Sequence, residues 1–145
     1  MDNFVFQVEW IDSEGDKGLR SSRREMSSLF GVVVADHESN IKIALSEKKL
    51  QSSQLFSYCR ALSEYFTMDL DSVGVVSSTE SWSQQVSRAF AAEFLAPIDA
   101  LVEKLGERDV VFRDDIAELS DTVHVSEWLI RHQIENQTSM LIIDD

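Results

Sequence analysis

Hydrophobic and polar residues alternate along the first third of the chain, with the period of two that is typical of β-strands. Three segments rich in aromatic and β-branched residues carry this alternation: residues 4–11, 29–36 and 40–46. The short polar stretch between the second and third segments predicts a β-hairpin. Residues 12–25 are polar and contain two glycines, so we expect a long loop there. Its arginines, Arg20, Arg23 and Arg24, lie either against an anion or in solvent.

From about residue 52 the hydrophobic period changes to that of an α-helix. One helical face of residues 52–67 collects large apolar side chains: Leu55, Phe56, Cys59, Leu62 and Phe66. Neither proline nor glycine interrupts this segment. We therefore expect a helix over residues 52–67 that packs this face into the core.

The rest of the chain predicts a loop with some extended character at residues 67–79, and then mostly helices. The expected helices are residues 82–95, 98–105, 113–123 and 127–136. Pro97 ends or kinks the first of these, and Gly106 closes the second. The tail, residues 139–145, reads as a short apolar strand or an ordered arm. The expected fold class is α+β, with a small antiparallel N-terminal sheet packed on a helical C-terminal part in a single domain, residues 1–145.

Composition narrows the class of protein. The chain has 145 residues, 43% of them hydrophobic, which is enough to bury a core in one domain. No apolar run approaches the roughly 18 residues that a membrane span needs, and the N-terminus has no signal-peptide pattern. The single cysteine, Cys59, excludes an internal disulfide and suits a reducing compartment. We expect a soluble, cytoplasmic protein with no membrane partner.

Charge adds a second constraint. The chain carries 26 Asp and Glu against 13 Lys and Arg, a net charge of −13. From Glu93 onward there are 13 acids and four bases, so −9 of that charge lies in the C-terminal part. Such a field repels nucleic-acid phosphates and attracts basic surfaces. The acidity serves either solubility alone or an acidic interaction face, for which the candidates are Asp114, Asp115, Glu118 and Asp121.

Four segments, in order, resemble the ImmA/IrrE family of metallopeptidase domains. They are GVVVADHESNIKIALS, YCRALSEYF, SRAFAAEFLAP and IAELSDTVHVSEWLIRHQIEN. The resemblance spans roughly residues 29–137, and AFAAEFLAP is its most specific piece. It implies a zincin-like fold in which a β-hairpin precedes a zinc-binding helix that reads His-Glu-x-x-His. A second helix would then supply a glutamate as the third ligand.

The residues that this chemistry needs are missing from the matching positions. In the family motif, two histidines one helical turn apart bind Zn²⁺, and the glutamate beside the first acts on the bound water. Here Arg60 and Glu64 stand at the histidine positions, and Ala61 stands at that of the glutamate. Gln84 or Val86 falls where the third ligand would be. Arginine has no lone pair to offer a cation, and alanine accepts no proton.

The resemblance therefore implies a pseudoenzyme with no catalytic residue, no metal and no cofactor. We expect a vestigial cleft lined by Arg60, Ala61, Glu64 and Gln84, with an i, i+4 ion pair between Arg60 and Glu64. Among the other candidates, His132 and Glu135 have a spacing compatible with a metal but suit a solvated helix end better. Cys59 reads as a packed core thiol.

Two classes of function stay open. The first is a protein-binding regulatory module, bacterial or phage, that acts on a basic, repressor-type transcription regulator of a mobile element or stress response. The second is an acidic DNA mimic, or a helix-turn-helix DNA-binding regulator that uses residues 116–136. The charges of this segment oppose direct nucleic-acid binding, because Glu118, Asp121, Glu127 and Glu135 face Arg131 alone. No surviving constellation supports a working enzyme.

Overall fold

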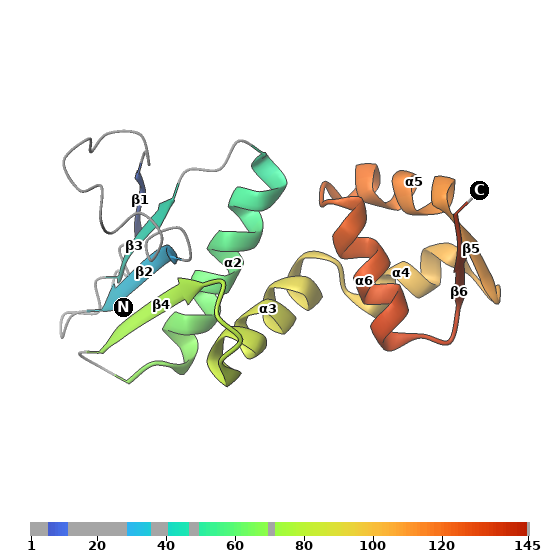
Figure 1. Cartoon of the computed structure of the whole chain (residues 1–145). Helices are drawn as coiled ribbons and strands as arrows, with labels where there is room; N and C mark the ends of the chain where they lie inside the picture. The colour runs from blue at the N-terminus through green and yellow to red at the C-terminus, as the bar shows by residue number, and fades with distance from the viewer. Residues whose placement is uncertain (1–5, 12–28, 36–40, 47–49, 70–71, 145) are drawn as a thin grey trace, which may run out of the picture. The chain divides into compact units, whose positions relative to one another are not determined.

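The structure is a computed structural model that describes residues 6–11, 29–35, 41–46, 50–69 and 72–144. Figure 1 shows their strands and helices, and the predicted α+β class is confirmed. The chain divides into two compact units, Met1–Phe90 and Ala91–Asp145, each of which is described by itself below. The single-domain organisation stays a prediction, and the loop with Arg20, Arg23 and Arg24 lies outside the described residues. No described helix is long and apolar enough to cross a membrane.

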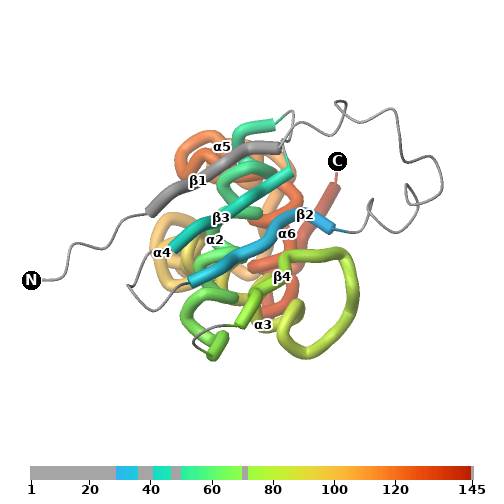
Figure 2. The backbone as a smooth tube through the Cα atoms, turned by 90° about the vertical axis from the view of Figure 1, so that its left-hand side faces the viewer, coloured from blue at the N-terminus to red at the C-terminus, as the bar shows by residue number. Residues whose placement is uncertain are grey.

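The first unit contains a four-stranded sheet in the order β1-β3-β2-β4. The strands are β1 (Phe6–Ile11), β2 (Leu29–Ala35), β3 (Ile41–Ser46) and β4 (Val73–Ser77). Figure 2 shows β3, β2 and β4 side by side in this order. β2 pairs antiparallel with both β3 and β4, so the predicted hairpin is confirmed.

β2, β3 and β4 form the antiparallel sheet that was predicted, and the observed sheet adds two details to that prediction. β1 pairs parallel to β3, with Phe6 opposite Ile41, so the sheet is not antiparallel throughout. The alternating pattern is the same in both kinds of sheet, and only the choice of neighbour sets the strand direction. β4 lies in the segment that was expected to be a loop with some extended character. The alternating pattern of β4 is short and contains Gly74, so the local sequence predicts a strand only weakly. Pairing with β2 stabilises the strand.

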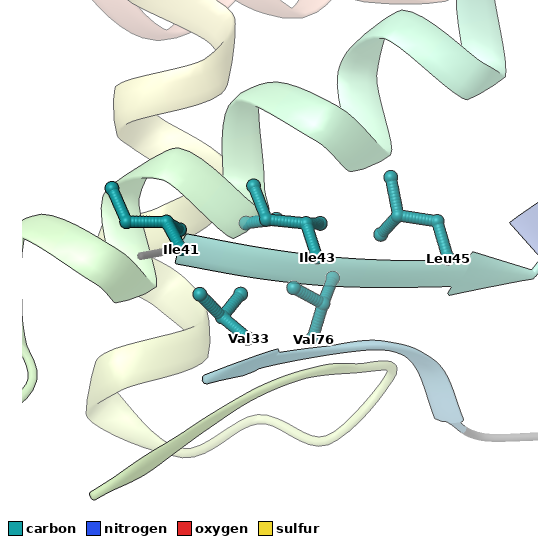
Figure 3. Close-up of a cluster of buried hydrophobic side chains, with 6 residues drawn as sticks. Val33, Ile41, Ile43, Leu45 and Val76 are labelled. Carbon is teal, nitrogen blue, oxygen red and sulfur yellow. The ribbon is translucent and has the colours of Figure 1, made fainter. Parts of the chain in front are cut away.

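The core of this unit lies where α2 (Gln51–Thr67) packs on the sheet. Ile41, Ile43 and Leu45 project from one face of β3 toward the helix, and Val33 and Val76 lie beside them (Figure 3). Each of these side chains is almost fully buried. On the helix the cluster meets Ala61, whose small side chain lets α2 approach the strands closely.

The predicted helix is confirmed, but its predicted buried face is largely wrong. Cys59 is buried, and burial raises the pKa of its thiol to about 11, in agreement with a packed core thiol. Phe56 and Leu62 are only half-buried, and Leu55 and Phe66 are exposed. The residues that α2 buries are small or polar: Ser57, Cys59, Arg60, Ala61, Ser63 and Glu64. The buried stripe is therefore rotated toward polar residues that hydrogen-bond inside the unit.

The second unit begins within α3 (Trp82–Leu95) and contains three further helices, α4 (Ile98–Leu105), α5 (Arg113–Val123) and α6 (Glu127–Gln137). Pro97 and Gly106 flank α4 as its N-cap and C-cap, and the glycine has a φ of 72°, as a helix end favours. The tail forms β6 (Leu141–Ile143), which pairs parallel with β5 (Val110–Phe112). The tail strand was expected, whereas its partner was not.

Candidate functional site

Arg60 is the centre of a buried polar cluster in the first unit. It points from α2 toward β4 and α3, and only 3% of its surface is exposed. Its Nη2 donates to the carbonyl oxygen of Ser77 and to Oε1 of Gln84, both at 2.7 Å. Its Nε donates to Oγ of Ser87 at 3.3 Å. The guanidinium thus ties α2 to the last residue of β4 and to two residues of α3.

Gln84 connects Arg60 to Glu64. Its Nε2 donates to Oε1 of Glu64 at 2.9 Å and to the carbonyl oxygen of Val75, while its Oε1 also accepts from the backbone N–H of Ser77 at 2.7 Å. The predicted ion pair between Arg60 and Glu64 is absent, because the Gln84 amide lies between the two groups and bonds to both. The cluster is a hydrogen-bonded chain, Arg60–Gln84–Glu64.

The same two side chains also close the edge of the sheet. β4 is an edge strand, and an edge strand carries backbone N–H and C=O groups that lack a strand partner. Gln84 bonds to backbone groups of Val75 and Ser77, and Arg60 takes the Ser77 carbonyl. Gly74 of β4 lies against α2, because a Cβ placed on it would come 3.0 Å from Cβ of Glu64. This close approach brings α2 against β4.

Burial shifts the pKa of both ionisable groups in the cluster. Desolvation lowers the pKa of Arg60 to about 10, aided by the charge of Arg88 and opposed by that of Glu64. Desolvation raises the pKa of Glu64, opposed by the charge of Arg60 and the hydrogen bond from Gln84. With a pKa of about 10, Arg60 stays a cation at neutral pH. The cluster thus holds a permanent positive charge beside a single carboxyl group.

These residues do not fit the zinc ion that the His-Glu-x-x-His motif of the ImmA/IrrE family binds. A zinc site needs three protein ligands with free lone pairs, and Glu64 is the only carboxylate in the cluster. The positive charge of Arg60 repels a metal cation. Both the oxygen and the nitrogen of the Gln84 amide are already hydrogen-bonded. Ala61 is fully buried and offers no proton acceptor. Within the described part of the chain, no three His, Cys, Asp or Glu side chains come together as a metal site would require.

A groove of about 540 Å³ opens beside the cluster. Hydroxyl groups of Ser77, Thr79, Ser81 and Ser83 line this groove. The other lining residues are Leu29, Glu64, Val73, Val75 and Gln84. Of the four residues expected to line a cleft, Glu64 and Gln84 do so, while Arg60 and Ala61 lie buried behind them. Sequence reasoning missed Ser77 and Ser87, and no motif marks them, because their roles come from a backbone carbonyl and from a helix–helix contact.

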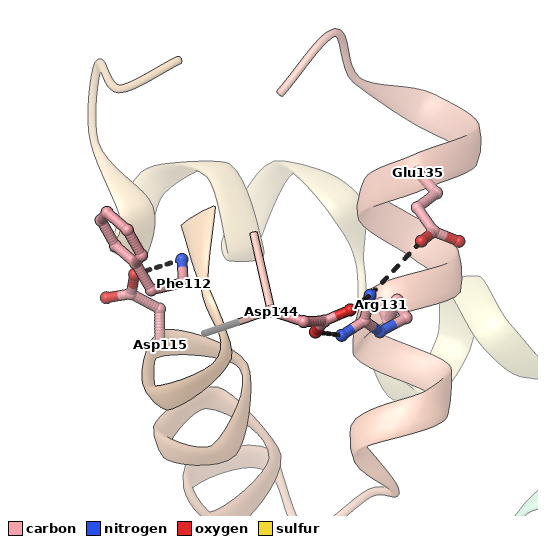
Figure 4. Close-up of polar contacts among 5 residues, drawn as sticks. All are labelled: Phe112, Asp115, Arg131, Glu135 and Asp144. Atoms are coloured by element: carbon pink, nitrogen blue, oxygen red, sulfur yellow. Dashed lines mark hydrogen bonds and ion pairs between the residues drawn. The ribbon is translucent and has the colours of Figure 1, made fainter. Parts of the chain in front are cut away.

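The proposed acidic interaction face lies on α5 in the second unit. Asp114, Glu118 and Asp121 are exposed, and their spacing puts them along one side of the helix. Asp115 differs from them. Its Oδ2 accepts from the backbone N–H of Phe112 at 2.9 Å (Figure 4). Its Oδ1 pairs with Arg108 at 3.0 Å. Asp115 therefore caps the start of α5 and is less available to a partner.

The histidines form no metal site in the described part of the chain. His132 stacks on Trp128, with ring centroids 4.7 Å apart, and is exposed. Glu135 pairs instead with Arg131, at 3.8 Å. His37 lies outside the described residues, and His124 adopts a left-handed conformation at the end of α5, with a φ of 57°. His124 therefore has a backbone role in the turn between α5 and α6.

Comparison of the chain with protein-family models finds no match, and comparison with curated proteins finds none either. Membership of the ImmA/IrrE family therefore stays a prediction that rests on the resemblance of the segments quoted above. What the side chains themselves establish is a buried Arg60–Gln84–Glu64 cluster beside a hydroxyl-lined groove, and a separate acidic unit.

Proposed function

We propose that this chain is a catalytically inactive, ImmA/IrrE-like module with a zincin-like fold that binds another protein and regulates it. The favoured partner is a basic, repressor-type transcription regulator. The observation that carries the proposal is the Arg60–Gln84–Glu64 cluster, whose hydrogen bonds link α2 to β4 and to α3. A cation and a bridging amide take the positions that the resemblance gives to two metal ligands.

The cluster supports a structural role for residues that would otherwise be catalytic. Among the described residues, no buried side-chain nitrogen or oxygen lacks a hydrogen-bond partner, so the buried polar atoms of Arg60 and Gln84 are satisfied within the fold. The position that the resemblance gives to the general base holds Ala61, whose apolar, buried side chain cannot accept a proton. What the cluster does is join α2, β4 and α3 through buried hydrogen bonds. The fold is thereby stabilised without a metal.

The binding role is supported by the charge of the second unit. Ala91–Asp145 contains 13 acids and four bases, and three exposed carboxylates lie along α5. A surface of one sign steers a partner of the opposite sign and accelerates their encounter. Basic DNA-binding proteins are such partners, and they are also what the family resemblance implies. Anionic membranes and nucleic acids would be repelled.

Two measurements test the proposal. Chain purified without a metal-binding tag is loaded with zinc, dialysed and analysed for bound metal, and its cleavage of casein is followed with and without chelator. We expect no stoichiometric zinc and no chelator-sensitive cleavage. Stoichiometric bound zinc, or cleavage that the chelator abolishes, would overturn the inactive assignment. The tagged chain is also used to recover partners from a bacterial host, and each is purified and rebound. Binding only by acidic partners would overturn the charge argument.

A helix-turn-helix function has one favourable observation. α5 and α6 are joined by a three-residue turn, His124 to Ser126, and Ser126 accepts a hydrogen bond from the N–H of Leu129 as the N-cap of α6. However, α6 carries Glu127 and Glu135 against Arg131, whereas a helix in the major groove needs positive charge. Anisotropy of labelled duplex DNA at low salt decides between them. Binding that weakens as salt rises would favour DNA recognition over protein binding.

A further inference from the structure

We infer that the outer face of the β5–β6 sheet docks an extended, basic polypeptide segment with apolar side chains at every second position. This inference rests on the proposed protein-binding function and names the surface that would serve it. The surface is defined by four residues, Val110, Phe112, Leu141 and Ile143, and is called the β5–β6 face below.

The register of the two strands defines this face. Val110 pairs with Leu141, and Phe112 pairs with Ile143, so these four side chains lie on the same side of the sheet. Leu141 is 67% exposed, Phe112 47% and Ile143 40%, while Val110 is half-buried. The residues between them point the other way, and Val111 is fully buried. The sheet thus packs one apolar side into the unit and leaves a second apolar side in solvent.

The sheet is held firmly enough to act as a platform. The backbone N–H of Leu141 donates to the carbonyl oxygen of Asp109 at 2.8 Å, at the start of the strand pair. Directly after β6, Asp144 pairs with Arg131 of α6, which also contacts Glu135 (Figure 4). The other end of the face is held where Asp115 caps the N–H of Phe112. Both strands are therefore anchored to helices of the same unit.

Phe112 occupies a position where its residue type is unfavourable for folding. It is the N-cap of α5, with extended backbone angles, and it makes no side-chain capping bond. Serine, threonine, aspartate and asparagine are preferred there, because a side-chain oxygen satisfies the first helical N–H groups. A half-exposed aromatic ring at this position costs helix stability and gains little burial. Its side chain is better explained by a contact with another molecule.

Charge selects the occupant. The second unit has a net charge of −9, so two copies meeting at this face would bring like charges together. The same charge repels anionic lipid and nucleic acid. Next to the face in sequence, Asp109 and Asp114 are exposed, and so is the base Arg113. Two further bases, Arg108 and Arg131, are already paired with carboxylates. A segment with lysine or arginine beside its apolar residues satisfies both the apolar face and its acidic surroundings.

The geometry also fits an extended segment. The sheet has only two strands, so each strand has one edge without a partner strand among the described residues. A peptide in β conformation adds to such an edge through main-chain hydrogen bonds, and its side chains then alternate between the two faces. Apolar side chains at every second position would continue the row formed by Phe112 and Ile143. Lysine or arginine side chains at the intervening positions would project from the other side of the added strand, into the field of this acidic unit.

Synthetic peptides test this inference with the full chain. The probe alternates lysine with valine, a charge-matched control alternates lysine with serine, and a second control alternates glutamate with valine. Binding is measured by isothermal titration calorimetry. We expect the lysine–valine peptide to bind more tightly than either control, and Leu141→Ser and Phe112→Ser each to weaken its binding by about tenfold. The matched control variant is Leu50→Ser in the first unit, because Leu50 is 66% exposed, and it should bind as the wild type does.

The variants also separate loss of binding from loss of fold. Phe112→Ser introduces a preferred N-cap residue, so its melting temperature should not fall while its affinity does. Equal affinity of Leu141→Ser, Phe112→Ser and wild type would overturn the assignment of this face, while recovery of a basic regulator would still support the proposed function. Failure of the wild type to prefer the lysine–valine peptide would overturn the partner chemistry. Self-association of the wild type that Leu141→Ser abolishes, measured by sedimentation, would assign the face to a second copy instead.

Discussion

Gln84 donates a hydrogen bond of 2.9 Å to the carboxyl group of Glu64 while its amide oxygen accepts from Arg60 at 2.7 Å. This pairing explains how a helix can bury an arginine and a glutamate one turn apart without an ion pair between them. Each charged group is satisfied by a neutral amide, and the amide also bonds to the backbone of β4. The cluster thus supports the edge of the sheet.

Gln84→Ala should lower the free energy of unfolding by about 3 kcal/mol, since it leaves several buried polar groups without partners and each costs about 1–3 kcal/mol. The groups affected are those of Arg60, Glu64 and the backbone of β4. Urea unfolding at neutral pH measures the change. The matched control is Gln85→Ala on the exposed side of the same helix, which should change stability by no more than about 0.5 kcal/mol. Equal effects of the two substitutions would contradict the role given to Gln84.

Glu64 should make stability depend on pH. Its pKa is raised in the folded state, so the folded chain binds this proton more tightly than the unfolded chain. Stability contributed by the protonated form is present below the unfolded pKa and is lost as pH rises to the raised folded value. Glu64→Gln removes this loss, so the variant should gain stability relative to wild type as pH rises above about 4.3. Unfolding of both proteins across pH 4 to 8 gives the difference, and a gap that narrows with rising pH would contradict the prediction.

Introducing the His-Glu-x-x-His motif should damage the fold rather than give peptidase activity. Ala61→Glu places a carboxylate where the side chain is fully buried against the sheet, and we expect it to cost about 3 kcal/mol or more. Ala100→Glu, on the exposed side of α4, is the control and should be nearly neutral. The triple variant with Arg60→His, Ala61→Glu and Glu64→His should show no chelator-sensitive peptidase activity. Thermal melting with a casein assay measures both results.

The rotated face of α2 predicts unequal costs for two large apolar residues. Leu62 is half-buried and packs against the core cluster, so Leu62→Ala should destabilise by about 2 kcal/mol, the low end for core truncations. Phe66 is mostly exposed, and Phe66→Ala should cost less than about 1 kcal/mol even with the loss of its ring contacts to Tyr65 and Phe90. Chemical denaturation compares them. A larger loss for Phe66→Ala would restore the face predicted from periodicity.

The carboxylates of α5 should separate into two kinds. Asp115→Ala removes the cap on Phe112 and should cost about 1 kcal/mol, whereas Asp114→Ala should leave stability almost unchanged. Reversal of Asp114, Glu118 and Asp121 to lysine, with Asp115 kept, should slow association with a basic partner about tenfold. The rate for wild type should fall as salt rises above about 0.15 M, where the screening length is about 8 Å. Stopped-flow association rates that ignore both changes would assign the acidity to solubility alone.

The sequence by itself determined the elements whose pattern is local. The alternation in residues 29–36 and 40–46 predicted β2 and β3, because one face of each strand is buried. Helical spacing, Pro97 and Gly106 likewise set the bounds of the helices, since caps and breakers act within one turn. Placing Arg60, Glu64 and Gln84 together was also possible, but only through the resemblance to a family motif.

The tertiary structure decided whatever depends on neighbours distant in sequence. β1 runs parallel because it pairs with β3, and β5 and β6 exist as strands because they meet each other. Periodicity predicted that Phe66 lies in the core, because the pattern takes account of hydrophobicity alone. In the structure Phe66 is exposed and Arg60 is buried. Burial of a guanidinium is favourable only where Ser77, Gln84 and Ser87 together satisfy it, and no stretch of α2 alone carries that information.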